Sequence, residues 1–365
     1  MEEFMIKFVH TADLHLGSVF EKASFGNAAA KIRRDEMFKT FEHIVELAIS
    51  LKKDFILICG DLFEEKYCTT FDIHRVFDVL KQVKNIQVII AAGNHDLLSN
   101  TYRQYIGKYP NVHIFSSDKI EKKEFAEHNT VVYGLSWDKS AYFSEPDFSN
   151  VELDQSKINI LMLHADTVTN STYMPININK ISALGFDYIA LGHIHQAQQV
   201  APRAYYPGCP EALDFKELGA HGIYCISLDK TAFSTEFVKT ANREFVVHHV
   251  ELTPDMGYID IIREITADIS HDSMTKDMHR FEITGMLDAS INMVEIMDQV
   301  RQTFFYLEYK DNTVPDFDIQ KLKEENRDNI IGRFITKMEA FDLQDETNKK
   351  ALFKGISVLL DDRSS

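Results

Sequence analysis

Cysteine is scarce in this chain of 365 residues. It occurs only at Cys59, Cys68, Cys209 and Cys225, and no two of these form a CxxC pair. The spacing therefore gives no sign of a zinc or thiol-redox motif. We expect reduced, mostly buried thiols, because a chain of this length needs no disulfide to stabilise its core. A GxxxxGK[ST] phosphate loop and internal repeats are also missing.

Long apolar runs are missing as well. No stretch approaches the roughly 18 uninterrupted apolar residues of a membrane-spanning helix. The N-terminal segment MEEFMIKFVH is acidic, and it lacks the basic start and long apolar run of a signal peptide. The sequence therefore predicts a cytoplasmic protein with no membrane partner.

Basic residues are outnumbered by acidic ones. Lys and Arg total 39 against 56 Asp and Glu, which gives a formal net charge of −17. Proteins that bind long nucleic acids hold the phosphates mainly with Lys and Arg. If the substrate is DNA, we expect the affinity to be weak, local or supplied by a partner.

The order of the predicted elements indicates an α/β fold. The first part of the chain alternates buried-strand runs at 6–10, 55–59 and 88–92 with helical stripes over 31–50 and 71–83. This βαβαβ order is typical of a layered α/β domain. Short strands dominate after residue 110, at 112–115, 131–135, 158–163, 188–191 and 222–227. We therefore expect two packed sheets flanked by helices.

The composition shifts near residue 245. From there strand and helix patterns alternate again without an obvious catalytic cluster, which predicts a small α+β capping domain over 245–317 after a first domain over 1–244. Residues 318–365 read as two amphipathic helices. These helices either pack back on the capping domain or dock on a partner, since apolar helix pairs of this kind bind grooves and coiled coils.

Metal-ligand residue types follow the predicted strands at separated places. They are Asp13-Leu14-His15, Gly60-Asp61, Gly93-Asn94-His95-Asp96, His164 and Gly192-His193-Ile194-His195. Sites in α/β sheets form outside the carboxyl ends of strands, so these loops can converge. Each motif is weak alone, but the ordered set predicts one metal site. We expect the remaining histidines, His10 and His221 among them, to be structural.

The donor types suit borderline divalent ions. Imidazole and carboxylate ligands together favour Mn, with Fe, Zn or Ni as alternatives. Two such ions about 3.5–4 Å apart can clamp a phosphate and activate water. A pair of ions needs a bridging carboxylate, and Asp61 in its tight Gly-Asp turn is the candidate. Gly60 and Gly93 suit the close backbone approach of a crowded metal turn.

The ordered set DxH, GD, GNHD, H and GHxH resembles the signature of calcineurin-like metallophosphoesterases. The segments FVHTADLHLGS, GDLFE, AAGNHD and GHIHQAQ are similar to the SbcD branch of DNA-repair exonucleases and its YhaO relatives. The resemblance covers residue 6 to about residue 230, and more weakly PDFDIQKL and NIIGRFI near the C-terminus. It implies a two-sheet metallophosphoesterase sandwich with flanking helices, and a DNA exo- or endonuclease that uses two divalent metal ions, Mn²⁺ above all.

The resemblance also implies roles and partners. The first metal would be held by Asp13, His15, Asp61 and His195. The second would be held by Asp61, Asn94, His164 and His193. His95 would bind no metal; it would stabilise the transition state and protonate the leaving oxygen. The implied partners are DNA, a coiled-coil ABC ATPase of the SbcC type that contacts the C-terminal helices, and a second copy of the chain at the helix over 71–83.

Two questions stay open at this point. Glu64, three residues after Asp61, either orients His95 and favours its protonated form or is a solvated loop residue. The chain is either a DNA nuclease, a phosphodiesterase or phosphatase for nucleotides or phosphoproteins, or a scaffold with a relic metal site. The acidic charge slightly favours the second function, and the intact ligand set argues against the third.

Overall fold

The structure, a computed structural model, describes residues 5–20, 27–288 and 290–361. The chain divides into two compact units, Met1–Glu244 and Phe245–Ser365. Each unit has its own hydrophobic core. The further division that we expect at residue 317 stays a prediction.

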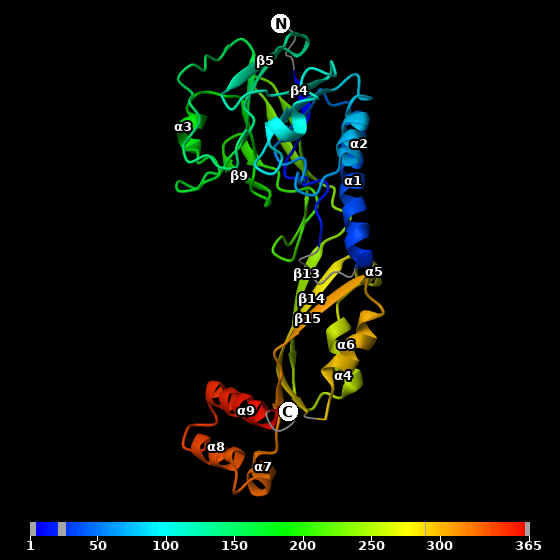
Figure 1. Cartoon of the computed structure of the whole chain (residues 1–365), viewed down its shortest axis with the longest axis vertical. Helices are drawn as coiled ribbons and strands as arrows, with labels where there is room; N and C mark the ends of the chain where they lie inside the picture. The colour runs from blue at the N-terminus through cyan, green and yellow to red at the C-terminus, as the bar shows by residue number, and fades with distance from the viewer. Residues whose placement is uncertain (1–4, 21–26, 289, 362–365) are drawn as a thin grey trace. The chain divides into compact units, whose positions relative to one another are not determined.

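The first unit contains two six-stranded sheets (Figure 1). The first sheet has the strand order β12-β11-β1-β2-β3-β4. Its strands are β1 Ile6–Thr11, β2 Phe55–Cys59, β3 Gln87–Ala91, β4 Val112–Ile114, β11 Gly222–Leu228 and β12 Phe233–Lys239. Strands β1 to β4 are parallel, whereas β11 and β12 are antiparallel additions at one edge. Every residue of β2 is buried, as its run FILIC predicts for a central parallel strand.

The second sheet has the order β5-β6-β7-β8-β10-β9. Its strands are β5 Glu121–Phe125, β6 Thr130–Gly134, β7 Ile158–His164, β8 Tyr188–Gly192, β9 Gln198–Ala201 and β10 Ala204–Tyr206. The centre β6-β7-β8-β10 is parallel, and antiparallel strands lie at both edges. Two parallel centres of this kind place the carboxyl ends of several strands along one edge of each sheet.

The main core lies between the two sheets. Phe8 and Leu57 from the first sheet share one buried cluster with Ile160 and Tyr188 from the second. Helices α1 Asn27–Ser50 and α2 Thr70–Leu80 flank the first sheet, and α3 Ile178–Ser182 lies on the side of the second (Figure 1). The predicted arrangement of two packed sheets with flanking helices is confirmed.

Most of the apolar stripe of helix α2 packs within the first unit. It begins at a capping box in which Thr69 and Asp72 satisfy each other's backbone N–H groups. Val76, Phe77 and Leu80 are buried, whereas Phe71 is 75% exposed. Core burial therefore accounts for the stripe apart from Phe71.

The second unit is built on a parallel sheet of β13 Phe245–Leu252, β14 Met278–Asp288 and β15 Tyr306–Asp311, with the short strand β16 Val314–Asp316 paired to β14. Helices α4 Tyr258–Thr266 and α6 Met293–Arg301 lie together on one face of this sheet (Figure 1), and α5 His271–Lys276 precedes β14. Buried Ile261 of α4 and Ile296 of α6 join one cluster with Phe281 of the sheet. The alternation of strands and helices predicted for this region is therefore present, with the strands paired in parallel.

The C-terminal segment forms three helices, so the prediction of two was wrong. They are α7 Ile319–Glu325, α8 Ile330–Met338 and α9 Glu346–Asp361. Helix α7 shows no clear apolar periodicity in the sequence, because it is short and supplies only Ile319 and Leu322 to the apolar cluster of α8 and α9. That cluster is closed by the buried residues Ile331, Ile335, Leu352 and Ile356.

The remaining helical segments are single turns, η1 Leu98–Tyr102 and η2 Ala126–His128. Among the helices of the described ranges, none has both the length and the apolar content needed to cross a lipid bilayer.

Candidate metal centre

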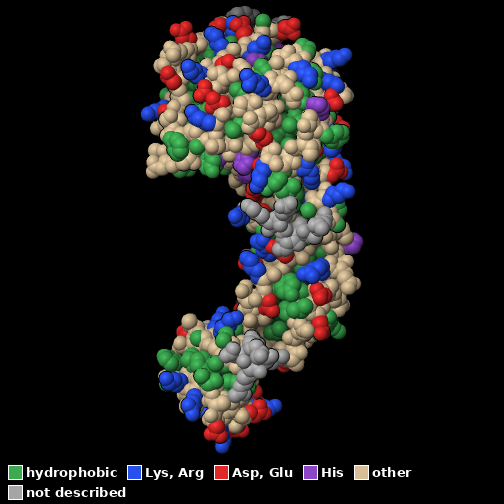
Figure 2. Space-filling view, in the orientation of Figure 1, with side chains coloured by type: hydrophobic (Ala, Val, Ile, Leu, Met, Phe, Trp, Pro, Cys, Tyr) green, Lys and Arg blue, Asp and Glu red, His purple; other side chains and the backbone are tan. Residues whose placement is uncertain are grey.

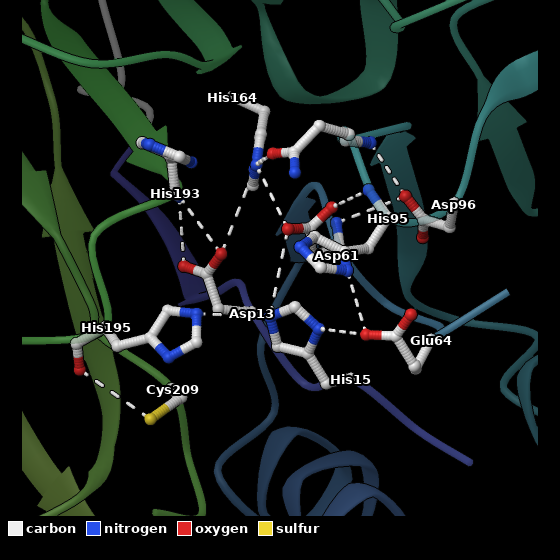
Figure 3. A network of polar contacts seen from close by, with 12 residues as sticks. Asp13, His15, Asp61, Glu64, His95, Asp96, His164, His193, His195 and Cys209 are labelled. Carbon is white, nitrogen blue, oxygen red and sulfur yellow. Dashed lines mark hydrogen bonds and ion pairs between the residues drawn. The ribbon is translucent and has the colours of Figure 1, made fainter. Parts of the chain in front are cut away.

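Loops at the carboxyl ends of five strands meet between the two sheets. Asp13 follows β1, Asp61 follows β2 and Asn94 follows β3 in the first sheet, while His164 ends β7 and His193 follows β8 in the second. Strand β2 contacts β7 and β8 across the core, and β3 contacts β7. The side chains of Asp13, His15, Asp61 and His164 consequently point toward one another in Figure 3. This is the convergence that the strand-end pattern predicts.

Several of these residues have unusual backbone conformations. Asp13, His15, Asp61 and His193 all have positive φ, at 52°, 43°, 50° and 109°. Non-glycine residues in this region cost roughly 1–3 kcal/mol each and cluster at functional sites. Backbone hydrogen bonds hold two of them, from Asp13 N to the Gly60 carbonyl at 3.1 Å and from His15 N to the Asp61 carbonyl at 2.9 Å. The first two loops are therefore fixed as one unit.

Glycine is required at three positions in these loops. A Cβ at Gly60 would lie 2.2 Å from His164 Nδ1, and a Cβ at Gly93 would lie 2.2 Å from Asp61 Oδ1. Equally, a Cβ at Gly192 of GHIH would lie 1.8 Å from the Cys59 carbonyl oxygen. All three distances are far below van der Waals contact. The predicted close approach of the backbone is thus confirmed at Gly60 and Gly93.

One group of donors contains Asp13, His15 and His195, whose ligand atoms lie within 4.8 Å of one another. The Nε2 atoms of His15 and His195 face each other at 3.1 Å. The backbone N–H of His193 donates to both carboxylate oxygens of Asp13, at 3.1 and 3.0 Å. These contacts place the residues expected for the first metal side by side.

A second group contains Asp13, Asp61 and His164, all three of them buried. Nε2 of His164 lies 2.9 Å from Asn94 Oδ1 and 3.3 Å from Asp61 Oδ2. The same Asp61 oxygen is 3.7 Å from His15 Nε2, so it lies between the two groups. The ring of His193 adjoins this group, with its centroid 5.3 Å from that of His164.

The donor set fits a pair of cations. Nδ1 of His164 donates to the Cys59 carbonyl at 2.9 Å, because a carbonyl can only accept. The lone pair of a neutral His164 Nε2 then faces two oxygen acceptors, Asn94 Oδ1 and Asp61 Oδ2. Lone pairs that converge in this way repel one another unless positive charge lies among them. The Nε2 atoms of His15 and His195 also face each other, and a cation between them would accept both lone pairs when both rings carry their proton on Nδ1.

The electrostatics of the protein alone also call for positive charge. Burial disfavours the charged imidazole of His164, but the carboxylates of Asp61 and Asp13 outweigh burial and raise its pKa to about 9. Burial would raise the pKa of Asp61, yet His164 and His15 hold it below its ordinary range. The field that stabilises a proton on His164 is the field that would stabilise a metal ion in its place.

His195 and His193 differ although both belong to GHIH. Burial disfavours charge on His195, but its hydrogen bond to Glu217 and the charge of Asp13 raise its pKa to about 9. Burial and the neighbouring His164 lower the pKa of His193 to about 4. His193 is therefore neutral near pH 7, which is the form that binds a metal ion.

His95 lies at the open edge of the site. Its side chain is 43% exposed, and its Nδ1 is 2.8 Å from Glu64 Oε2. Glu64 is 17% exposed and is also 3.5 Å from His15 Nδ1. This geometry favours the orienting role of Glu64 over the solvated-loop alternative. His15, Glu64 and His95 also lie close enough to hold an ion, so the role of His95 needs a direct test.

A Glu64→Gln variant should change the pH–rate profile in one direction. The Glu64 hydrogen bond raises the pKa of His95, despite the opposing effect of burial, and keeps its imidazolium form to higher pH. The variant removes this charge and lowers that pKa. If activity requires protonated His95, the basic limb of kcat against pH should move to lower pH. Glu65→Gln is the matched control, because Glu65 instead accepts from Leu97 N. An unchanged basic limb in Glu64→Gln would contradict the orienting role.

Two residues without a role predicted from the sequence support the site. Buried Asp96 accepts hydrogen bonds from the backbone N–H groups of Gly93, Asp61 and Phe63, and from the hydroxyl of Tyr102. The GNHD motif marked Asp96, but its role is to hold the backbone of these turns and not to face the donor groups. Glu217 lies 2.6 Å from His195 Nδ1 in an irregular loop, far from any motif, and no pattern marks it.

Comparisons with known proteins agree with this geometry. The family model described as calcineurin-like phosphoesterase matches residues 6–197. The uncharacterised metallophosphoesterase YhaO of Bacillus subtilis is 32% identical over 64% of this chain and 60% of its own length. The DNA double-strand break repair protein Mre11 of Saccharolobus solfataricus is 25% identical over 94% of this chain and 93% of its own length. Over the first relatives, the chain spans about half to three fifths of their length.

Solved structures are similar at low identity. A dimetal phosphatase from Danio rerio is 10% identical, with a TM-score of 0.42 over 66% of this chain and 97% of that one.

Proposed function

The chain belongs to the calcineurin-like phosphoesterase family, and we propose that this metal-dependent phosphoesterase is a DNA nuclease that acts in repair. The observation that carries the proposal is the convergence of Asp13, Asp61, His164 and His195 around positions that demand positive charge. The similarity to Mre11 over nearly the whole chain supports DNA as the substrate. A complete donor set argues against a non-catalytic scaffold.

In this proposal the two donor groups would hold two divalent ions. The first would be held by Asp13, His15, Asp61 and His195, and the second by Asp61, Asn94, His164 and His193. Mn²⁺ is the expected metal, because mixed imidazole and carboxylate donors suit it. When bound, such a pair supplies Lewis acidity toward phosphate and an activated water.

The chain's own residues would then orient His95 and protonate the leaving oxygen. The Asp61 carboxylate accepts the backbone N–H of His95 at 2.8 Å, which fixes the start of the turn that carries the His95 ring. The Glu64 carboxylate at Nδ1 favours the imidazolium, so that Nε2 has a proton to donate to the leaving oxygen. His95 is exposed enough to reach a phosphodiester from solvent.

Nothing in this scheme reads base identity, so hydrolysis should tolerate any sequence. Tyr173 lies beside the site, with its ring centroid 4.7 Å from that of His193 and 41% of its surface exposed. Such a ring can stack on a base without regard to its type. The selectivity would then come from strand geometry.

The charge of the protein limits unassisted binding of duplex. On the face of the first unit in Figure 2, Lys and Arg side chains are interspersed with Asp and Glu instead of forming one basic patch. Together with the net charge of −17, this supports weak or partner-assisted affinity for DNA. The proposed partner is a coiled-coil ABC ATPase of the SbcC type.

The same acidic charge supports a second candidate, a phosphodiesterase or phosphatase for nucleotides or phosphoproteins. One substrate panel with Mn²⁺ separates the two. It compares duplex DNA ends with bis-p-nitrophenyl phosphate, cyclic nucleotides and phosphopeptides. Preferential hydrolysis of DNA supports the nuclease, whereas phosphopeptide or cyclic-nucleotide hydrolysis without DNA cleavage would replace it by the second candidate.

The C-terminal helices are the proposed docking site for the ATPase. Their mutual packing buries Ile331 and Ile335, but it leaves Ile330, Phe341 and Val358 63%, 57% and 57% exposed. Hydrophobic side chains are visible on this segment in Figure 2. We predict that replacing these three exposed residues by Ser abolishes co-purification with the ATPase while phosphodiesterase activity and melting temperature stay unchanged.

The control for this variant replaces exposed Lys354 of α9 by Ala, which leaves the apolar surface intact. Undiminished binding of the ATPase by the triple variant would contradict docking at these residues. A strong loss of thermal stability would instead indicate that the three side chains pack within the chain.

A homodimer and a cytoplasmic location also stay predictions. With most of the α2 stripe buried, only Phe71 offers that helix a large exposed apolar contact. Light scattering at micromolar concentration should show a dimer that Phe71→Ser converts to monomer. A monomeric wild-type protein would contradict the predicted homodimer.

A further inference from the structure

The carboxylate of Glu217 joins the metal site to a loop that no motif covers. Glu217 Oε1 lies 2.6 Å from His195 Nδ1, and the Glu217 side chain is 18% exposed. The hydrogen bond reaches across 22 residues of sequence, from GHIH to the irregular segment after β10. It contacts the ring nitrogen of His195 that points away from His15.

The other oxygen of Glu217 is held by the same loop. Oε2 accepts the backbone N–H of Leu213 at 2.7 Å and the thiol of Cys209 at 3.4 Å. Buried His221 lies against the backbone carbonyls of Cys209, at 2.9 Å, and Glu217, at 3.1 Å. The carboxylate therefore has one fixed orientation, with a single oxygen directed at His195.

This contact decides which nitrogen of His195 can bind a cation. A carboxylate only accepts, so Nδ1 of His195 carries the proton. Nε2 is left to face His15 Nε2 at 3.1 Å, within the group that contains Asp13. Carboxylate partners of this kind fix the ring orientation of a metal-binding histidine and make it a stronger ligand.

The second donor group is supported differently. There the ring of His164 is held by the backbone carbonyl of Cys59 at 2.9 Å, which no side-chain substitution removes. The group of His15 and His195 thus depends on a replaceable side chain, and the group of His164 does not. A substitution of Glu217 should therefore weaken metal binding at the group of His15 and His195 more than at the group of His164.

We propose that Glu217 is the positioning residue that orients His195, so that one of the two metal sites depends on Glu217 and the other does not. The proposal rests on the proposed two-metal function. It gives the loop over 209–221 a role in metal binding, through Cys209 and Leu213, which hold Glu217.

The test compares Mn²⁺ binding by isothermal titration calorimetry in wild type, Glu217→Ala and Glu217→Gln. In Glu217→Ala one of two sites should weaken by about 10–100-fold, the usual effect of removing such a partner. Glu217→Gln should lose less, because its carboxamide oxygen still accepts from Nδ1–H. Glu236→Gln, in an exposed position of β12, is the matched control and should bind like wild type.

A second readout needs no metal. The Nδ1–H proton of His195 should be visible by NMR in metal-free wild type, because its hydrogen bond to Glu217 slows exchange with solvent. The signal should be lost in Glu217→Ala. Equal weakening of both sites, or no weakening, would overturn the proposal, as would a His195 Nδ1–H signal that survives in Glu217→Ala. A wild-type protein that does not bind two metal ions would overturn the proposed function instead. The NMR comparison would then still show whether Glu217 orients the His195 ring.

Discussion

Asp61→Asn should lose both bound metal ions and about 10⁴-fold or more in kcat, the scale on which removal of a central catalytic residue acts. Asp61 Oδ2 lies 3.3 Å from His164 Nε2 and 3.7 Å from His15 Nε2, so a single oxygen serves both donor groups. The variant replaces a buried charge by a neutral amide of the same shape. Two cations close together would then lack the negative charge between them.

The shape of Asn keeps this variant interpretable. Asp61 also accepts the backbone N–H of His95, and the amide oxygen can still do so. Circular dichroism and thermal melting should therefore show a folded protein. Asp54→Asn, a carboxylate before β2 at the opposite end of the strand, is the matched control and should retain both metal ions and activity. Full metal content in Asp61→Asn would refute the bridging role.

His95→Ala should lose roughly 10²–10⁴-fold in kcat on DNA, the usual contribution of one general acid, and should keep both metal ions. The loss should be much smaller on bis-p-nitrophenyl phosphate, because p-nitrophenolate leaves without a proton. His43→Ala, on an exposed position of α1, is the control for a distant imidazole.

This pair of substrates separates two roles of His95. Its ligand atom lies close to those of His15 and Glu64, so coordination of an ion is a real alternative. A His95→Ala protein without metal would show that His95 is a ligand. An equal loss on both substrates with metal retained would exclude proton donation to the leaving oxygen.

Strands buried on both faces could be read from the sequence. The runs of β2, β7 and β8 are fully buried, and their apolar composition predicts them. The edge strand β5, with the sequence EKKEF, could not be found, because its central residues are exposed and polar. β12, FSTEFVK, was missed for the same reason. Their pairing to β6 and β11 depends on long-range hydrogen bonds that leave no local pattern.

The sequence could predict those site residues that belong to a recognisable motif. Each of the residues expected to bind metal ends or follows a strand, and the structure places them near one another, while their binding of metal stays a prediction. Asp96 and Glu217 act through backbone N–H groups and through His195 respectively, and their contacts depend on how the loops fold. Charge alone does not distinguish Glu217 from the many solvated glutamates of an acidic chain.

The two-metal phosphodiesterase account is tested most directly by titrating metal-stripped wild type with Mn²⁺ while bound metal and DNA hydrolysis are measured on the same samples. We predict that two ions bind per chain and that hydrolysis appears as the pair is completed. A folded protein that binds at most one ion, or that hydrolyses phosphodiesters equally well without metal, would contradict the account.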